Sequence, residues 1–133
     1  MDYLYDDKPV LHKELTEQII ESFYKVYNTL GYGFLENVYQ NALYFELTNN
    51  GFNCEAQKDI KVYYANRCVG NYRADIVVDD LIILELKAAD EINMAHATQL
   101  LNYLKATKYE VGLLLNFGKK AEIRRRIFEN KYK

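Results

Sequence analysis

The sequence has no tryptophan, one proline and only two cysteines among its 133 residues. Cys54 and Cys68 are too few for the disulfide framework of a small secreted protein, and their spacing is not that of a zinc site. The longest apolar runs, at 81–84 and 111–115, are far shorter than the roughly 18 residues of a membrane helix. Since no secretory signal is visible either, we expect a cytoplasmic protein that does not associate with a membrane.

The overall composition is that of a folded soluble chain. Half of the residues are hydrophobic and 27% are charged, which argues against disorder. The length suits one domain and leaves little room for two. We therefore expect an N-terminal tail over residues 1–10, a single domain over 11–128 and a C-terminal tail over 129–133.

Charge of one sign is not in excess, because the formal net charge is only −2. The charges are unevenly distributed, however, and residues 118–133 carry seven bases against two acids. A basic end could meet phosphate, although most runs of this kind are simply solvated. The seven bases are Lys119, Lys120, Arg124, Arg125, Arg126, Lys131 and Lys133.

Hydrophobic periodicity predicts the order of the secondary structure. Apolar residues at three- and four-residue steps predict helices over about 12–30, 35–49 and 93–107. Alternating or continuous apolar residues predict strands over about 60–64, 68–78, 81–88 and 111–117, and a last edge strand over 123–128. The order is therefore α-α-β-β-β-α-β-(β). A meander of three strands followed by a helix and a strand predicts an α/β (α+β) fold with a mixed sheet covered by helices.

Three charged residues interrupt the most apolar predicted strands: Asp75, Glu85 and Lys87. Such groups are costly to bury without partners, so a folding argument alone would place Val or Ile at these positions. Magnesium prefers oxygen ligands and is often held by one or two carboxylates, which gives the two acids a role in phosphodiester hydrolysis. Lys87 would then stabilise charge in the transition state. The alternative is a buried ion pair that only fixes the strand register.

The loop between the second and third predicted strands decides whether the two acids can share a metal ion. A two-residue turn at Asp79-Asp80 would pair Asp75 with Leu84 and put Asp75 and Glu85 on opposite faces of the sheet. A shared ion requires a shift by one residue. We therefore predict a three-residue loop over 79–81 or a bulge near Asp75.

The third predicted helix combines an apolar stripe with a polar face. The stripe is expected to contain Met94, Ala97, Leu101 and Leu104, and the polar face His96, Gln99 and Tyr103. This polar face could bind phosphate or orient Lys87, or it could be an ordinary solvated surface, which is the favoured interpretation for His96 alone. The spacing of Gln99 and Tyr103 is not distinctive by itself, because Gln40 and Tyr44 repeat it.

The second predicted helix begins with a short motif that contains Gly33, Glu36 and Tyr39. An acid in the first turn interacts favourably with the helix dipole, which is a sufficient structural explanation for Glu36. Tyr39 lies one turn later on the same face and would ordinarily belong to the core.

Taken together, these residues resemble the GxxExxY family, a branch of the PD-(D/E)XK nuclease superfamily with a restriction-endonuclease-like core. The resemblance covers residues 11–128. Gly33, Glu36 and Tyr39 match the family signature, Asp75, Glu85 and Lys87 match the acids and lysine of the superfamily, and Gln99 and Tyr103 are similar to the Gln-x-x-x-Tyr helix of RecB-type nucleases. One departure is Ala74, which stands where many members have proline.

The resemblance implies a set of site residues. The implied catalytic residues are Glu36, Asp75, Glu85, Lys87, Gln99 and Tyr103, and the implied ligands of Mg²⁺ or Mn²⁺ are Glu36, Asp75, Glu85 and the backbone carbonyl of Leu86. Tyr39 would pack or hydrogen-bond beside Glu36.

Two functions follow from this combination. The first is a magnesium- or manganese-dependent nuclease that hydrolyses DNA or RNA, with a homodimer as one way to cut both strands of a duplex. The second is a catalytically silent module of the same fold that binds nucleic acid or a protein partner. A cysteine hydrolase is disfavoured, because the predicted hairpin puts Cys68 opposite Tyr63 or Tyr64 and away from the charged face.

Overall fold

The computed structural model describes residues 11–133, so the predicted tail over residues 1–10 lies outside the described part. The elements are α1 (Lys13–Leu30), α2 (Glu36–Asn49), β1 (Cys54–Tyr64), β2 (Arg67–Val78), β3 (Ile82–Lys87), α3 (Met94–Ala106), β4 (Val111–Phe117), β5 (Ala121–Ile127) and a 3₁₀ helix, η1 (Asn130–Tyr132). The predicted order is confirmed, but β1 begins six residues earlier than the pattern at Ile60 indicates. No helix in residues 11–133 is long and apolar enough to span a bilayer.

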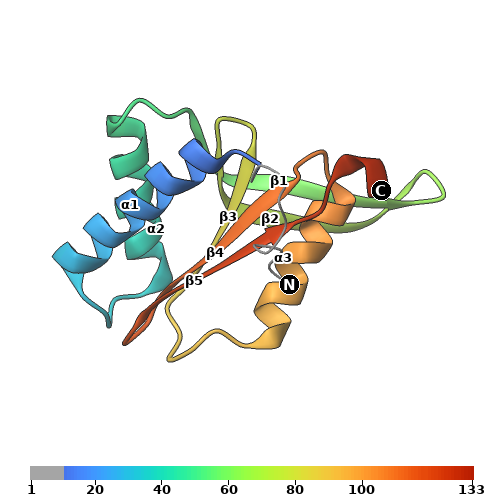
Figure 1. The fold of residues 1–133 in the computed structure, drawn as a ribbon. Helices are drawn as coiled ribbons and strands as arrows, with labels where there is room; N and C mark the ends of the chain where they lie inside the picture. Colours follow the sequence, from blue (N-terminus) through green and yellow to red (C-terminus); the bar gives the residue numbers. More distant parts are fainter. Residues whose placement is uncertain (1–10) are drawn as a thin grey trace.

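The five strands form one mixed sheet in the spatial order β1-β2-β3-β4-β5. Neighbouring strands are antiparallel except β3 and β4, which are parallel and are connected through α3. The predicted fold class is therefore confirmed. Figure 1 shows α1 and α2 together on one side of the sheet and α3 on the other.

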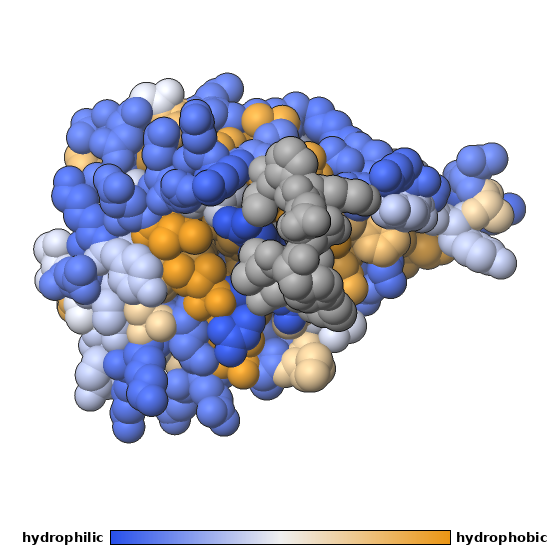
Figure 2. Space-filling view, viewed as in Figure 1, coloured by the Kyte–Doolittle hydropathy of each residue, from blue (hydrophilic) through white to orange (hydrophobic). Residues whose placement is uncertain are grey.

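Each helical layer buries its own apolar cluster against the sheet. On the α1–α2 side, Phe23, Tyr39 and Phe117 pack together, and their rings are fully or almost fully buried. On the α3 side, Leu100 and Leu104 pack against the opposite face of the same strands. The surface in Figure 2 is mostly hydrophilic, and its apolar residues form separate patches.

The stripe predicted for α3 is wrong at two positions. Met94 is 79% exposed and Leu101 is only half-buried, whereas Leu100 and Tyr103 are buried together with Ala97 and Leu104. The reason lies in β4, where Gly112 has no side chain and Leu100 fills the space. A Cβ at this glycine would lie 2.7 Å from Leu100 Cδ1. The partner strand therefore determines which side of α3 is buried.

The loop between β2 and β3 confirms the predicted three-residue connection over residues 79–81. Val78 pairs with Ile82 and Ile76 pairs with Leu84, so positions 75 and 85 face each other in the same register. Asp79 and Asp80 have left-handed backbone conformations, with φ of 52° and 54°, which aspartate tolerates better than most residues.

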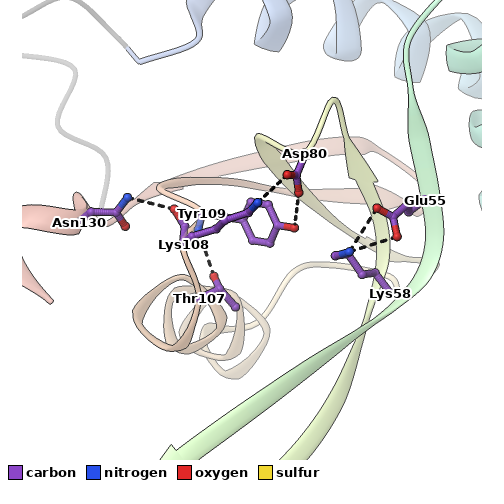
Figure 3. Close-up of polar contacts among 7 residues, drawn as sticks. All are labelled: Glu55, Lys58, Asp80, Thr107, Lys108, Tyr109 and Asn130. Carbon is purple, nitrogen blue, oxygen red and sulfur yellow. Dashed lines mark hydrogen bonds and ion pairs between the residues drawn. The ribbon is translucent and has the colours of Figure 1, made fainter.

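Contacts on both sides hold this loop in place. The Asp79 carboxylate accepts a hydrogen bond from the Asn53 N–H at 2.8 Å, and the Asp79 N–H donates to the Asn53 carbonyl at 2.6 Å. Asp80 accepts hydrogen bonds from Lys108 Nζ at 2.5 Å and from the Tyr109 hydroxyl at 2.7 Å (Figure 3). The loop is thus connected to the start of β1 on one side and to the approach to β4 on the other.

The last residues, which we expected to form a tail, contain η1 and contact the connection between α3 and β4. The Asn130 N–H donates to Glu110 Oε2 at 2.9 Å, and Lys133 Nζ donates to the carbonyl groups of Thr107 and Tyr109.

The chain directly after β3 depends on Asn116, which is fully buried in β4. Its side-chain oxygen accepts from the Ala89 N–H at 3.0 Å, and its amide group donates to the Ala89 carbonyl at 2.9 Å. One side chain therefore satisfies both backbone groups of Ala89, two residues after the charged end of β3.

We predict that Asn116→Ala lowers the free energy of unfolding by about 2–4 kcal/mol, because two backbone groups and Glu122 lose a buried partner. Urea unfolding of the purified proteins measures the change. Asn41→Ala, at an exposed position of α2, is the matched control and is expected to stay within about 0.5 kcal/mol of the wild type. Equal stability of the two variants would contradict this role of Asn116.

Candidate active site

Asp75 and Glu85 lie at the point where β2 and β3 separate. The paired part of the two strands ends at Ile76 and Leu84, and the next opposed positions are those of the two acids. Beyond this point the Leu86 N–H donates to Asp75 Oδ2 at 2.7 Å. The carboxylate thus takes the place of a backbone acceptor, which lets the strands diverge without leaving this N–H unpaired.

β1 and β2 bend at the same point. Ile76 and Val78 belong to the cluster under α1 and α2, whereas Ala74 belongs to the cluster under α3. Residues two positions apart in a regular strand face the same side, so the regular alternation of β2 is broken between positions 74 and 76. Gln57, which the register puts opposite Asp75, has a left-handed backbone with φ of 53°. The bend therefore coincides with the position of the acid.

The two carboxyl groups are buried together and interact unfavourably as like charges. Glu85 is only 9% exposed, and its Oε1 has no hydrogen-bond partner in the described part of the chain. Burial, and secondarily the charge of Asp75, raises the pKa of Glu85 to about 8. Burial also raises the pKa of Asp75, although the Leu86 N–H and the charge of Lys87 oppose this increase.

Lys87 ends β3 on the same face as Glu85 and is half-buried. Its positive charge lowers the pKa of both carboxyl groups, so the three groups are close enough to interact. With the residues that the structure describes, its ammonium forms no ion pair within 4.0 Å. The buried ion pair that would only fix the register is therefore not formed here.

Gln99 and Tyr103 also reach this side of the sheet. Gln99 Nε2 donates to the Tyr103 hydroxyl at 2.5 Å. Tyr103 is 5% exposed, and burial, followed by the charge of Glu85, raises its pKa. Its hydroxyl is therefore within electrostatic reach of the acids. His96 instead lies in the first turn of α3, where its N–H donates to the N-cap Asn93 at 3.0 Å.

The signature before α2 builds a loop. Tyr39 is fully buried and stacks on Phe117 with ring centroids 4.3 Å apart. Its hydroxyl donates to the Gly31 carbonyl at 2.6 Å and accepts from the Phe34 N–H at 3.2 Å. Gly33, between these two residues, has φ of 112°, which a residue with a side chain rarely adopts. Gly33 and Tyr39 therefore shape the turn that starts α2.

Glu36 is the first residue of α2 and is exposed. Gln40 follows one turn later on the same face and accepts a hydrogen bond from Gln57 Nε2 at 2.7 Å. Gln57 lies opposite Asp75 in the register of β1 and β2, and it opposes the rise in the pKa of that carboxyl group. The Gln40–Gln57 hydrogen bond thus connects the face of α2 that carries Glu36 with the strand position opposite Asp75.

Residues 11–133 contain no group of three or more His, Cys, Asp or Glu side chains that could hold a metal ion. The structure therefore brings together two acids and a lysine, while Glu36 stays outside that group. Mg²⁺ needs no more than one or two carboxylates, because water and substrate phosphates complete its octahedron. The unpartnered Glu85 oxygen and the repulsion between the carboxylates fit a divalent cation between them.

Two residues of this site were missed by sequence reasoning. Gln57 gave no signal, because neither its left-handed backbone nor its place opposite Asp75 is visible in a local pattern. Gln40 did give a weak signal, since it repeats the Gln-x-x-x-Tyr spacing of α3, but that spacing alone does not distinguish a site residue from a solvated one.

Comparisons with known proteins support the fold and the family of this chain. A search of curated proteins finds no match. Among solved structures, the chain is similar to the protein in "Crystal structure of SSO0001", with a TM-score of 0.54 and 19% sequence identity. That match covers 71% of this chain but only 50% of the other, so it supports the fold alone.

The model of one protein family, described as the PD-(D/E)XK nuclease superfamily, matches residues 13–126. The matched range runs from the first residue of α1 almost to the end of β5, and it includes the diverging strands with Asp75, Glu85 and Lys87. The chain belongs to the PD-(D/E)XK nuclease superfamily.

Proposed function

We propose that the protein is a magnesium- or manganese-dependent nuclease that hydrolyses phosphodiester bonds of DNA or RNA. The observation that carries the proposal is the pair of opposed, buried carboxyl groups of Asp75 and Glu85, beside a lysine that is not paired with either of them. Members of the superfamily usually use divalent metal ions, which agrees with the chemistry of these side chains.

Each residue of the proposed site has a separate task. Asp75 and Glu85 supply the oxygen ligands, and the Leu86 N–H fixes the orientation of the Asp75 carboxylate. A divalent ion bound there would polarise the phosphate and lower the pKa of a bound water. The backbone carbonyl of Leu86 remains a proposed further ligand, because it lies between the two charged residues of β3.

Lys87, Gln99 and Tyr103 would act on the substrate. The Lys87 ammonium would stabilise the negative charge that develops on the phosphate or orient the attacking water. Tyr103 is held by Gln99 and by burial, so its hydroxyl is in a fixed position for a hydrogen bond to phosphate. Preorganisation of this kind costs no reorganisation at the moment of reaction.

We also propose that the chain belongs to the GxxExxY branch. Two of the signature residues, Gly33 and Tyr39, have a structural role here that accounts for a glycine and a tyrosine at these positions. Gly33 and Tyr39 shape the turn before α2, and this turn makes Glu36 the first residue of the helix. The hydrogen bond between Gln40 and Gln57 connects the same face of α2 with the strand position opposite Asp75. Glu36 would therefore be the third acid of the site.

The first prediction from the proposed function concerns cleavage. With millimolar Mg²⁺ or Mn²⁺, we expect the wild type to cut at least one member of a panel of single-stranded DNA, duplex DNA and RNA. Asp75→Asn and Glu85→Gln should abolish cutting and also the rise in melting temperature that the ion produces, because each removes a ligand charge. Lys87→Met should slow cutting on the order of 10²- to 10³-fold while keeping that rise.

Glu21→Gln, at an exposed position of α1, is the matched control and should behave as the wild type. Absence of cutting on every substrate, together with binding to nucleic acid that ignores the metal, would favour the silent binding module instead. A homodimer stays a prediction that sedimentation of the active protein can test.

The second prediction concerns pH in metal-free buffer. In the unfolded chain the carboxyl group of Glu85 loses its proton near its ordinary pKa of 4.5, whereas in the folded protein it keeps the proton up to about 8. The folded state therefore binds more protons in this window, and its free energy of unfolding falls as the pH rises. Urea unfolding with EDTA at several pH values should show this fall for the wild type and a flatter curve for Glu85→Gln.

Added Mg²⁺ should reverse the trend, because the ion competes with the proton and stabilises more at pH 8 than at pH 6. Parallel curves for the wild type and Glu85→Gln would rule out the burial of a protonated Glu85.

The third prediction concerns Glu36. We expect Glu36→Gln to raise the Mg²⁺ concentration needed for half-maximal cutting several-fold. The free energy of unfolding of the metal-free protein should change by less than about 1 kcal/mol, because the exposed side chain loses only its interaction with the helix dipole. Titration of the cutting rate with Mg²⁺ measures the effect, and Glu21→Gln is again the control. An unchanged titration would limit the site to Asp75 and Glu85.

A further inference from the structure

A groove of about 800 Å³ lies between α3 and the outer half of the β1–β2 hairpin. The end of this hairpin projects beyond the rest of the sheet in Figure 1, and among the described residues α3 forms the opposite wall of the groove. The strand wall consists of Val62, Tyr63 and Tyr72, and the helix wall includes Gln99, Asn102, Tyr103 and Lys105.

The groove is continuous with the candidate active site through Tyr103. Tyr103 lines the groove, its ring contacts Tyr72 with centroids 5.4 Å apart, and it is within electrostatic reach of the carboxyl groups of Glu85 and Asp75. Tyr72 is 46% exposed and Tyr63, which also lines the groove, is 62% exposed. Aromatic side chains of the groove therefore extend from the buried Tyr103 into solvent. A chain bound at the acids would therefore have exposed aromatic faces available on the side of Tyr103.

Gly70 leaves space for the ring of Tyr72. This glycine does not have a positive φ, so its backbone does not require a glycine. A Cβ at Gly70 would lie 3.1 Å from the edge of the Tyr72 ring, which shows that the ring lies along the strand over this residue. The missing side chain leaves room for the ring in the orientation that lines the groove.

The side chains that line the groove favour a particular class of ligand. None of the described residues that line the groove is an acid, and the one charged residue is Lys105. Amide and hydroxyl groups on α3, from Thr98, Gln99 and Asn102, can donate to and accept from base edges. Aromatic faces stack on bases of any sequence, and a cation meets the phosphate backbone.

We propose that this groove binds the unpaired nucleotides of a single-stranded nucleic acid next to the bond to be cut, with Tyr72 and Tyr63 stacking on its bases. The position of these nucleotides next to the bond that is cut rests on the proposed nuclease function. The binding of a single strand in the groove does not depend on it. A duplex is disfavoured as the occupant, because its bases are already stacked on one another and do not present free faces to the tyrosines.

The experiment measures binding without cutting. Fluorescence anisotropy in EDTA compares a labelled oligothymidylate, an oligouridylate and a DNA hairpin of equal length. We expect the wild type to bind both single strands more tightly than the hairpin. Tyr72→Ala should weaken binding to the single strands roughly 5- to 100-fold, whereas Tyr72→Phe should bind as the wild type does. Tyr44→Ala, at a tyrosine on α2 with 37% exposure, is the matched control.

Lys105→Gln should in addition reduce the slope of log affinity against log salt by about 0.7, the value for one phosphate contact with a single strand. Thermal melting identifies any variant that fails to fold, and Tyr63→Ala then replaces Tyr72→Ala, since Tyr63 is more exposed.

The outcomes separate this inference from the proposed function. Equal affinity for the hairpin and the single strands, or full affinity of folded Tyr72→Ala and Tyr63→Ala, overturns the inference even if the wild type cuts DNA. Binding that depends on Tyr72 in a protein that cuts no substrate supports the inference and counts against the nuclease function.

Discussion

The structure depends on the register between β2 and β3, because a slip by one residue would move Asp75 to the other face of the sheet. The register is set by a three-residue loop in which Asp79 and Asp80 both adopt a left-handed backbone. Hydrogen bonds to Asn53 on one side and to Lys108 and Tyr109 on the other keep this loop from sliding. Residues at the far end of two strands thus determine whether the acids can act together.

The opposed carboxyl groups lower the stability of the fold, and the surrounding sheet tolerates this cost. β3 is buried from Ile82 to Leu86, and apolar clusters cover both of its faces. Since the sheet cannot relax by exposing Asp75 and Glu85, their repulsion leads to a raised pKa of Glu85, about 8, rather than to an opening of the strands. Neither acid forms an ion pair with Lys87 in the described part of the chain. In the proposed function, a divalent cation would take the place of the proton that Glu85 keeps without metal.

The sequence allows more of the sheet to be predicted than of the helix that covers the site. The order of the strands along the chain follows from hydrophobic alternation. The requirement that two acids share a face left either a three-residue loop over 79–81 or a bulge near Asp75, and the structure has the loop. The buried side of α3 does not follow from its own periodicity, because the missing side chain of Gly112 in β4 selects Leu100. The role of Gln57 depends on a left-handed backbone within a strand, which the polar residues around it do not indicate. Both failures concern contacts between elements distant in the chain.

The short motif before α2 contains a buried residue with a structural role, Tyr39, and an exposed acid, Glu36. Tyr39 is buried under the sheet, where it stacks on Phe117 and binds the turn at Gly31. It cannot approach a phosphate from there, so its part in the motif is to hold the turn. Glu36 follows the same turn but is exposed, so its carboxylate is accessible from solvent. The three-residue spacings between glycine, acid and tyrosine put a turn with a positive φ, the first residue of a helix and a buried anchor in successive positions.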